Sequence, residues 1–431
     1  MIKLTHRWNF LLCVLLGVAA QSSVAQLRID ITSGVTDPIP IAVVHFGGGG
    51  FNFGQIIQQD LERSGRFRLL NNAAFPSQPQ RANEVIASIW RQAGAEYVVV
   101  GRSSATAESS VALDFELVNV LTGQRLLIDQ LVVTNTALRN GAHRISDRIY
   151  EKILGARSSF ATRIAYVSVD GVPPKQSYQL ILADADGENS RVILQSRFPL
   201  MSPAWSPNGE WIAYVSFESR SPAIYLQHLR TAERRRVSAR SGVNGAPSWS
   251  PNAKQLALTL SSPSGNLDIY LLDLDSLNLT RLTDDPGIDT EAVWSPDGGS
   301  LYFTSDRSGG PQIYHLILGA NEKPKRLTFS GNYNARARVN ADGTHLAMVT
   351  RGGSGYSIGI QDLRTGVMRV LSKGSQDESP AFSPDGGTLI YAGRERGQGL
   401  MATVSVDGLI LQKLKADRGD VREPAWSPFI P

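Results

Sequence analysis

Beyond its first 25 residues, this 431-residue sequence contains no cysteine and no long uncharged hydrophobic run. The single cysteine, Cys13, lies inside the N-terminal apolar segment. A disulfide framework, a thiol nucleophile and a thiolate metal site are therefore excluded from the rest of the chain. The lack of a further stretch of about 20 apolar residues likewise excludes a membrane-spanning helix there.

An excess of either charge is also missing. The chain has 43 Lys and Arg residues against 39 Asp and Glu residues, which gives a formal net charge of +4. Nothing in that balance requires nucleic acid as a partner. With 42% hydrophobic and 19% charged residues, the composition is that of a folded globular protein, and the length allows two domains.

The N-terminus has the composition of a secretory signal peptide. Lys3 and Arg7 lie just before an apolar run from Phe10 to Ala20, and residues 23–25 (Ser-Val-Ala) form a small-x-small cleavage site. About ten apolar residues are too few for a membrane-spanning helix, which needs roughly 20. We therefore predict that residues 1–25 are removed on export and that the remaining chain does not span a membrane.

A repeated phrase, Ala-x-Trp-Ser-Pro-Asp-Gly, determines the architecture of the C-terminal part. Its bulky apolar position recurs in steps of 44, 45, 45, 43 and 44 residues. Each of the first five copies is followed by a β-type run such as Ile212–Ser216, and Pro, Asp and Gly suit a tight turn between antiparallel strands. Four strands in about 44 residues match one propeller blade. The six positions are Trp205, Trp249, Trp294, Val339, Phe382 and Trp426.

The two ends of this array complement each other. Residues Arg163–Ser168 read as the second strand of a blade whose first strand is missing. Conversely, Pro424–Pro428 supply a first strand with no blade after it. Because a closed ring leaves no strand edge exposed, we predict that the C-terminal strand completes the first blade. The predicted fold class is therefore multidomain, with a small α/β N-terminal domain followed by a six-bladed, all-β propeller.

Strands and helices alternate in the region before the repeat. We expect strands at 40–46, 67–70 and 97–100, a hairpin over 111–134, and helices at 53–64, 83–94 and 137–154. The predicted domains are the signal peptide (1–25), the α/β domain (26–155), a linker (156–162) and the propeller (163–431).

No motif predicts catalysis or a resident cofactor. Gly47–Gly50 follow a strand and precede a helix, but their spacing fits neither G-x-G-x-x-G nor G-x-x-x-x-G-K. The sequence has no G-x-S-x-G nucleophile elbow, and its histidines are scattered singly without zinc-site spacing. We predict no catalytic residue, no cofactor and no metal ligand, and we leave open a cation in the propeller channel.

The order of these features resembles the TolB family, the periplasmic propeller proteins of the Tol-Pal system of Gram-negative bacteria. The resemblance rests on the signal peptide, the short α/β domain, the W-S-P-D-G blades and the ending Pro424–Phe429. It implies a non-enzymatic periplasmic adaptor that binds the lipoprotein Pal through one propeller face and TolA through its mature N-terminal segment. It also implies a role in outer-membrane integrity and in constriction during cell division, with other envelope proteins and imported bacteriocins as further partners.

In an up-and-down blade, alternate loops emerge on opposite faces, so the loops that enter the inner strands lie opposite the S-P-D-G turns. We expect these loops to bind the partner, because exposed polar loops on a rigid ring are good binding candidates. The resemblance marks Asn244, Gly245, Thr290, Glu291 and Glu378 for the Pal face. Asn334, Arg336 and Arg422 belong to the same set of loops, and in the fourth repeat Arg336 and Arg338 add positive charge.

The segment from Gln26 to about Thr36 holds few large apolar residues, so we expect it to be mobile and to order on its partner. For TolA, the residues implied are Gln26, Leu27, Arg28, Ile29 and Asp30.

Two other functions stay open. One is a hydrolase or lyase that uses Asp377, Glu378 and Glu423 as acid and base, and the other is a propeller that binds a glycan or a metal.

Overall fold

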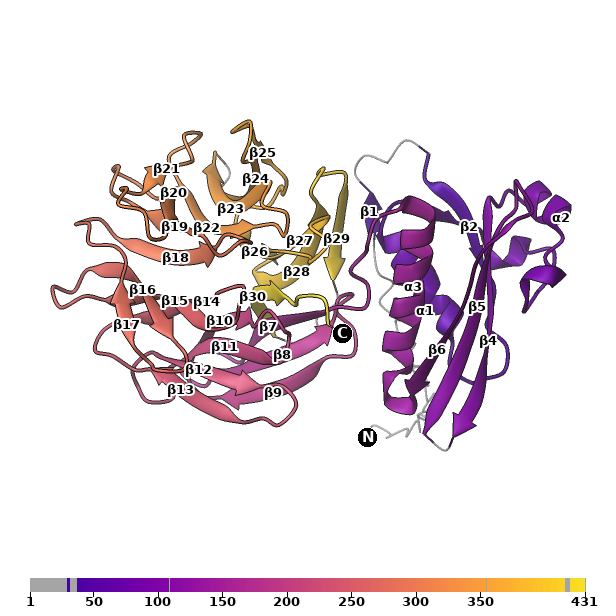
Figure 1. The fold of residues 1–431 in the computed structure, drawn as a ribbon, viewed down its shortest axis with the longest axis horizontal. Coiled ribbons are helices and arrows are strands. Elements are labelled where there is room, and N and C mark those ends of the chain that lie inside the picture. The colour runs from indigo at the N-terminus through magenta and orange to yellow at the C-terminus, as the bar shows by residue number, and fades with distance from the viewer. Residues whose placement is uncertain (1–28, 32–36, 108, 354, 415–418, 431) are drawn as a thin grey trace, which may run out of the picture.

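The computed structural model describes residues 29–31, 37–107, 109–353, 355–414 and 419–430. The predicted signal peptide and the predicted TolA residues Gln26, Leu27 and Arg28 lie outside the described residues. A small α/β domain stands beside a propeller, and the helices α1 and α3 lie between its sheet and the propeller (Figure 1).

The α/β domain is built on a five-stranded mixed sheet with the order β3-β2-β4-β5-β6, in which β2 pairs in parallel with β3 and β4. Helices α1 and α3 pack their apolar faces, including Ile57, Leu61, Ile145 and Ile149, into one core with the sheet. A second, smaller core forms around the buried Trp90 of α2. The elements are β2 (Ile39–Val43), α1 (Phe53–Arg63), β3 (Phe67–Leu69), α2 (Ala87–Gln92), β4 (Tyr97–Ala107), β5 (Ser110–Asn119), β6 (Arg125–Thr134) and α3 (Leu138–Leu154).

Two elements differ most in length from the expectation. The strand expected at 97–100 continues as β4 to Ala107, because it pairs along almost its whole length with β5. The helix expected at 83–94 is reduced to the 3₁₀ turn Ala82–Glu84 and the short α2.

The propeller has six antiparallel blades, as the repeat predicted. Blade 1 consists of β30 (Asp420–Trp426), β7 (Arg163–Asp170), β8 (Ser177–Asp184) and β9 (Arg191–Ser196). Blade 2 consists of β10 (Leu200–Trp205), β11 (Trp211–Ser216), β12 (Ala223–His228) and β13 (Arg234–Ser238). Blade 3 consists of β14 (Asn244–Trp249), β15 (Gln255–Ser261), β16 (Leu267–Asp273) and β17 (Leu279–Arg281). Blade 4 consists of β18 (Asp289–Trp294), β19 (Ser300–Ser305), β20 (Gln312–Ile317) and β21 (Lys325–Arg326). Blade 5 consists of β22 (Asn334–Val339), β23 (His345–Gly352), β24 (Gly355–Asp362) and β25 (Met368–Val370). Blade 6 consists of β26 (Glu378–Phe382), β27 (Thr388–Glu395), β28 (Gln398–Ser405) and β29 (Ile410–Leu414).

The repeated tryptophans connect neighbouring blades. The indole N–H groups of Trp205, Trp249 and Trp294 each donate a 3.1 Å hydrogen bond to a carbonyl of the preceding inner strand, those of Ala425, Ala204 and Ser248 respectively. Val339 and Phe382 have no such donor, so this particular hydrogen bond is missing from their interfaces. Trp426 donates instead to Thr162 Oγ1 at 2.8 Å, which fixes the C-terminal strand to the segment between the domains.

The sixth blade has a fifth strand that the sequence did not predict. The backbone of β1 (Ile29–Ile31) pairs antiparallel with β29 on the outer edge of this blade. Two of the residues expected in a mobile TolA segment, Ile29 and Asp30, therefore have strand partners, Gln412 and Leu411. A strand edge presents unpaired backbone groups that a three-residue segment can satisfy, whatever its apolar content.

Buried charges join the two domains. His143 of α3 is fully buried, and its Nδ1 lies 2.7 Å from a carboxylate oxygen of Asp60 on α1. Its Nε2 lies 3.8 Å from Asp184, the last residue of β8, and 4.0 Å from Asp186 in the turn between β8 and β9 of the propeller. Arg139 of α3 donates hydrogen bonds to the same two aspartates. Although burial by itself lowers the pKa of His143, the charges of Asp60 and Asp186 and hydrogen bonds to Asp184 and Asp60 raise it to about 10.

A second contact lies at the end of α1. Gly65 has the left-handed φ of 64°, and a Cβ there would lie 2.3 Å from Ile410 Cδ1 of β29. Next to it, Gln412 of β29 donates a 2.6 Å hydrogen bond to the carbonyl of Arg63. The outer strand of blade 6 therefore contacts β1 and α1 at once.

The protonated state of His143 gives a pH dependence. Since the folded-state pKa of about 10 exceeds the ordinary 6.5, its stabilising effect is complete below pH 6.5 and is lost as the pH rises towards 10. We expect the free energy of unfolding to fall over this window, by up to about 1.4 kcal/mol per pH unit. Urea unfolding at a series of pH values measures this slope, and His143→Gln should flatten it. The same slope in His143→Gln, or an equal flattening by His345→Gln in blade 5, would contradict this assignment.

Candidate partner-binding face

Each of the six inner strands contains a β-bulge at the same place. The residue three positions before the bulky apolar residue has a positive φ of 46–57° in every blade, although none of the six is glycine. Such backbone conformations are uncommon for L-residues with side chains and tend to occur at functional sites. We call these six residues the bulge ring: Ser202, Ala246, Glu291, Arg336, Ser379 and Glu423.

The bulge ring lines one end of a central cavity of about 320 Å³, to which all six inner strands contribute. One position before the bulky residue a second ring follows, in which Ala204, Ser248, Val293, Ala381 and Ala425 are small and only Arg338 is long. Burial lowers the pKa of Arg338, and the charge of Arg336 adds to this effect, against the opposite influence of Glu291 and Glu423.

Arg336 links three blades at the mouth of this channel. Its Nε donates a 2.6 Å hydrogen bond to Glu291 of blade 4, and its Nη1 donates to Ser379 Oγ of blade 6. Glu378 Oε2 lies 3.9 Å from Arg336 Nη1. Burial alone lowers the pKa of Arg336, but Glu291, Glu423 and Glu378 outweigh it and raise this pKa, so the guanidinium stays charged. Across the ring, Glu423 accepts a hydrogen bond from the backbone N–H of Ser202.

Two of the predicted Pal-face residues are buried and hold their own loops. Asn244 accepts hydrogen bonds from Ser238 Oγ and the backbone N–H of Arg240, and its Nδ2 donates to the Arg240 carbonyl. Asn334 occupies the same position in blade 5 and donates to Ser330 O and Gln312 Oε1. These side chains determine the shape of the loops rather than offering themselves at the surface.

The other predicted residues lie closer to solvent. Glu378 is exposed at the start of β26, and Gly245, Thr290, Glu291, Arg336 and Arg422 are half-buried. Thr290 Oγ1 lies 3.2 Å from Thr259 Oγ1, and Arg422 donates to Asp420 at 2.7 and 3.0 Å. The structure thus brings Glu291, Arg336 and Glu378 together, and places the rest around them.

Of the bulge ring, the predicted site residues include only Glu291 and Arg336, whereas Ser202, Ala246, Ser379 and Glu423 stand at the ends of the loops that were expected to form the face. A signal for them exists, because all six members stand three residues before the bulky apolar position. What the sequence does not give is the bulge itself, since Ser, Ala, Glu and Arg have no marked preference for positive φ.

The described residues offer one cluster with metal-ligand geometry, and it lies at the domain contact rather than in the channel. Asp60, His143 and Asp186 each place one ligand atom within 4.8 Å of the others. Their carboxylates already accept hydrogen bonds from Arg63 and Arg139, so the cluster is neutralised by the protein's own cations.

The comparisons with known proteins cover both domains. Residues 27–126 match the family model described as the TolB amino-terminal domain, and residues 150–430 match the TolB beta propeller domain. The chain is 44% identical over 437 residues to the Tol-Pal system protein TolB of Xanthomonas oryzae pv. oryzae, which covers 99% of each chain. The chain belongs to the TolB family.

Other TolB proteins agree with this assignment. The TolB of Xanthomonas euvesicatoria pv. vesicatoria is also 44% identical, again over 99% of each chain. The crystal structure of TolB from Acinetobacter baumannii superposes with a TM-score of 0.86 at 43% identity, and covers 94% of this chain and all of that one.

As a TolB, this protein is a non-enzymatic component of the Tol-Pal system. The alternative of a hydrolase or lyase with Asp377, Glu378 and Glu423 is therefore wrong. The side chains have other roles here: the buried Asp377, whose pKa is raised by burial, accepts a hydrogen bond from the backbone N–H of Gly374 in its own loop. Among the described residues, no helix is long and apolar enough to cross a membrane.

The charge network predicts that Arg336 stabilises the channel mouth. In the Arg336→Met variant, Glu291, Glu378 and Glu423 lose their shared cation. We expect the free energy of unfolding at pH 7 to fall by about 1–3 kcal/mol, which lies between the losses measured on breaking exposed and buried ion pairs. Urea unfolding measures this loss. Arg364→Met, in the turn between β24 and β25, is the control; an equal loss in both variants would refute the role of the network.

Proposed function

We propose that this protein is a periplasmic adaptor that binds the lipoprotein Pal through the bulge-ring face and TolA through its N-terminal segment. It thereby supports outer-membrane integrity and constriction during division in a Gram-negative bacterium. The observation that carries the proposal is the bulge ring, a six-fold set of strained residues with a linked charge network, on the face that the α/β domain leaves free.

The position of the α/β domain supports this choice of face. The α/β domain and the segment that follows it contact the turn side of the propeller. There, Asp385 of an S-P-D-G turn donates its backbone N–H to Ser159 Oγ in that segment. Asp407, in the turn between β28 and β29, lies 3.5 Å from Arg66. Because the bulge ring is at the opposite end of the inner strands, a protein partner can cover it without displacing the α/β domain.

The edge position of β1 supports a separate site for TolA. An extended segment that pairs with an exposed strand edge can also pair with another protein, since backbone hydrogen bonds supply much of the affinity in both cases. Binding of TolA to residues Ile29 and Asp30 then competes with β29 for the same backbone groups. Blade 6 carries Glu378 and Ser379 at one end of β26 and β1 on its far edge, so this one sheet connects the two proposed sites.

Calorimetric titration with the soluble domain of the host's Pal tests the first site. We expect saturable one-to-one binding that Thr290→Arg and Glu378→Arg each weaken by at least tenfold, because a long cation replaces a small or acidic group at the centre of the face. Thr365→Arg and Glu233→Arg, both exposed on turns of the opposite face, are the matched controls. Absence of binding by the unaltered protein, or equal losses in the controls, would refute the proposal.

Deletion of residues Gln26–Asp30 tests the second site. The deletion removes two of the three residues of β1, so TolA binding should be lost while Pal binding persists. Unchanged affinity for TolA would exclude this segment as its site. If the two sites are coupled, Pal must alter the affinity for TolA by the same factor by which TolA alters that for Pal.

A further inference from the structure

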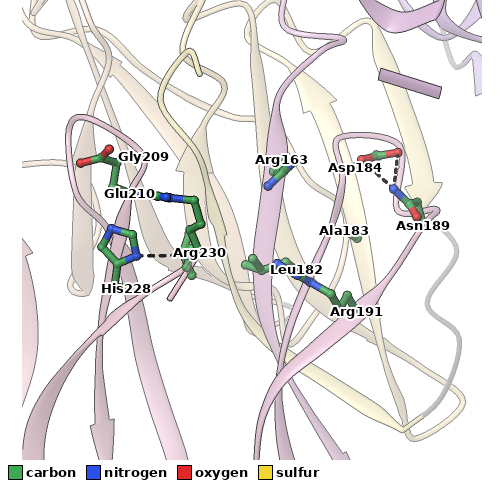
Figure 2. A pocket seen from close by; sticks show the side chains of 11 residues that line it. Arg163, Leu182, Ala183, Asp184, Asn189, Arg191, Gly209, Glu210, His228 and Arg230 are labelled. Carbon is green, nitrogen blue, oxygen red and sulfur yellow. Dashed lines mark hydrogen bonds between the residues drawn. The ribbon is translucent and has the colours of Figure 1, made fainter. Parts of the chain in front are cut away.

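A cavity of about 550 Å³ lies between blades 1 and 2 on the turn side of the propeller, away from the bulge ring. Figure 2 shows side chains from both blades around it, with Arg163 and Arg191 from blade 1 and Glu210, His228 and Arg230 from blade 2. Its volume is within the range of sites that hold small organic ligands.

Three arginines line this cavity without a counter-ion. Within the part of the chain that the structure describes, Arg163, Arg191 and Arg230 have no carboxylate within 4.0 Å and no side-chain hydrogen bond. They come from three separate places, the start of β7, the start of β9 and the turn after β12. Each guanidinium has five N–H donors in a planar fork that matches oxyanions.

His228 adds a donor of fixed orientation. Its Nδ1 accepts hydrogen bonds from the backbone N–H groups of Arg230 and Thr231, both at 3.2 Å. A ring nitrogen that accepts is not protonated, so in the neutral imidazole the proton must be on Nε2. The Trp211 and His228 rings pack in a T-shaped arrangement with centroids 4.8 Å apart, which holds the imidazole in place.

The two acidic residues of the cavity are already engaged by other groups. Asp184 accepts a 2.9 Å hydrogen bond from Arg139 of α3 and contacts Asn189. Glu210 accepts a 2.8 Å hydrogen bond from the side chain of Asn208. Because Asn208 is neutral, Glu210 keeps its charge, but the three arginines outnumber it and the cavity holds an excess of positive charge, which favours an anion over a cation.

We propose that this cavity binds a phosphate group, either free or as the monoester of a small polar molecule such as a sugar. Arg163, Arg191 and Arg230 supply bidentate charge-assisted hydrogen bonds from different sides, and His228 Nε2–H supplies a further donor. This site goes beyond the adaptor role, because it lies on the opposite face from the bulge ring and uses none of its residues.

The repeat provides a matched control inside the same chain. Arg364 occupies the position in blade 5 that Arg230 occupies in blade 2, each 25 residues after the bulky apolar position and each in the sequence Leu-Arg-Thr. Both are exposed, but only Arg230 lines the cavity.

Isothermal titration calorimetry of the full-length mature protein, at pH 7 and low ionic strength, tests the site with sodium phosphate and with glucose 1-phosphate. Saturable binding of one equivalent is expected, weakened about tenfold or more by Arg191→Ala or Arg230→Ala and unchanged by Arg364→Ala, since each lost hydrogen bond is to a charged group. Arg230→Lys, which keeps the charge without the fork, should retain part of the affinity. Tighter binding of glucose 1-phosphate than of phosphate identifies the monoester as the ligand, and equal binding identifies free phosphate.

Three results would overturn the proposal. One is the absence of saturable binding of both phosphate compounds. Another is an equal loss on Arg364→Ala and Arg230→Ala, which would reveal non-specific attraction to a basic surface. The third is binding of glucose as tight as that of glucose 1-phosphate. Thermal unfolding of each variant shows whether it is folded, and the exposure of all these arginines makes loss of folding unexpected.

Discussion

The propeller is a closed ring, and its closure depends on the antiparallel pairing of β30 with β7, which joins residues near position 425 to residues near 165. Without that pairing, blade 1 would expose the edge of β7 and blade 6 would end beside a gap. Closure also sets the bulge ring, because Glu423 of β30 is its sixth member and accepts the hydrogen bond from Ser202. The partner face is thus complete only when both ends of the propeller sequence have met.

The same closure fixes the α/β domain. Trp426, in the closing strand, donates to Thr162 at the end of the segment that follows α3. Asp147 of α3 accepts hydrogen bonds from Ser158 Oγ and from two backbone N–H groups of this segment, although burial raises its pKa to about 6. The segment is therefore held at both ends, and the charges around His143 contact a surface that has little freedom to move.

Much of this architecture can be read from the sequence, because the features concerned are periodic. The spacing of Trp205, Trp249 and Trp294 gives the blade period, and the unmatched strands at Arg163 and Pro424 give the closure. Features that arise from contacts between distant segments were not predicted. The β1 strand depends on an available edge at β29, and the bulges depend on the geometry of the ring rather than on glycine. The burial of Asn244 and Asn334 likewise follows from loop hydrogen bonds to residues four positions earlier, such as that between Asn244 and Arg240.

The electrostatics of the channel depend on the fourth copy of the repeated phrase, in the inner strand of blade 5, where Arg336 and Arg338 stand among the small residues of the other blades. Three glutamates, Glu291, Glu378 and Glu423, act on the charge of Arg336, and two of them also act on Arg338. Three clustered carboxylates would otherwise repel one another or attract a cation from solution. Since a tethered guanidinium already lies between Glu291 and Ser379, the chain itself compensates part of this negative charge. A cation that took the place of Arg336 would have to break its hydrogen bonds to Glu291 and Ser379 in two neighbouring blades.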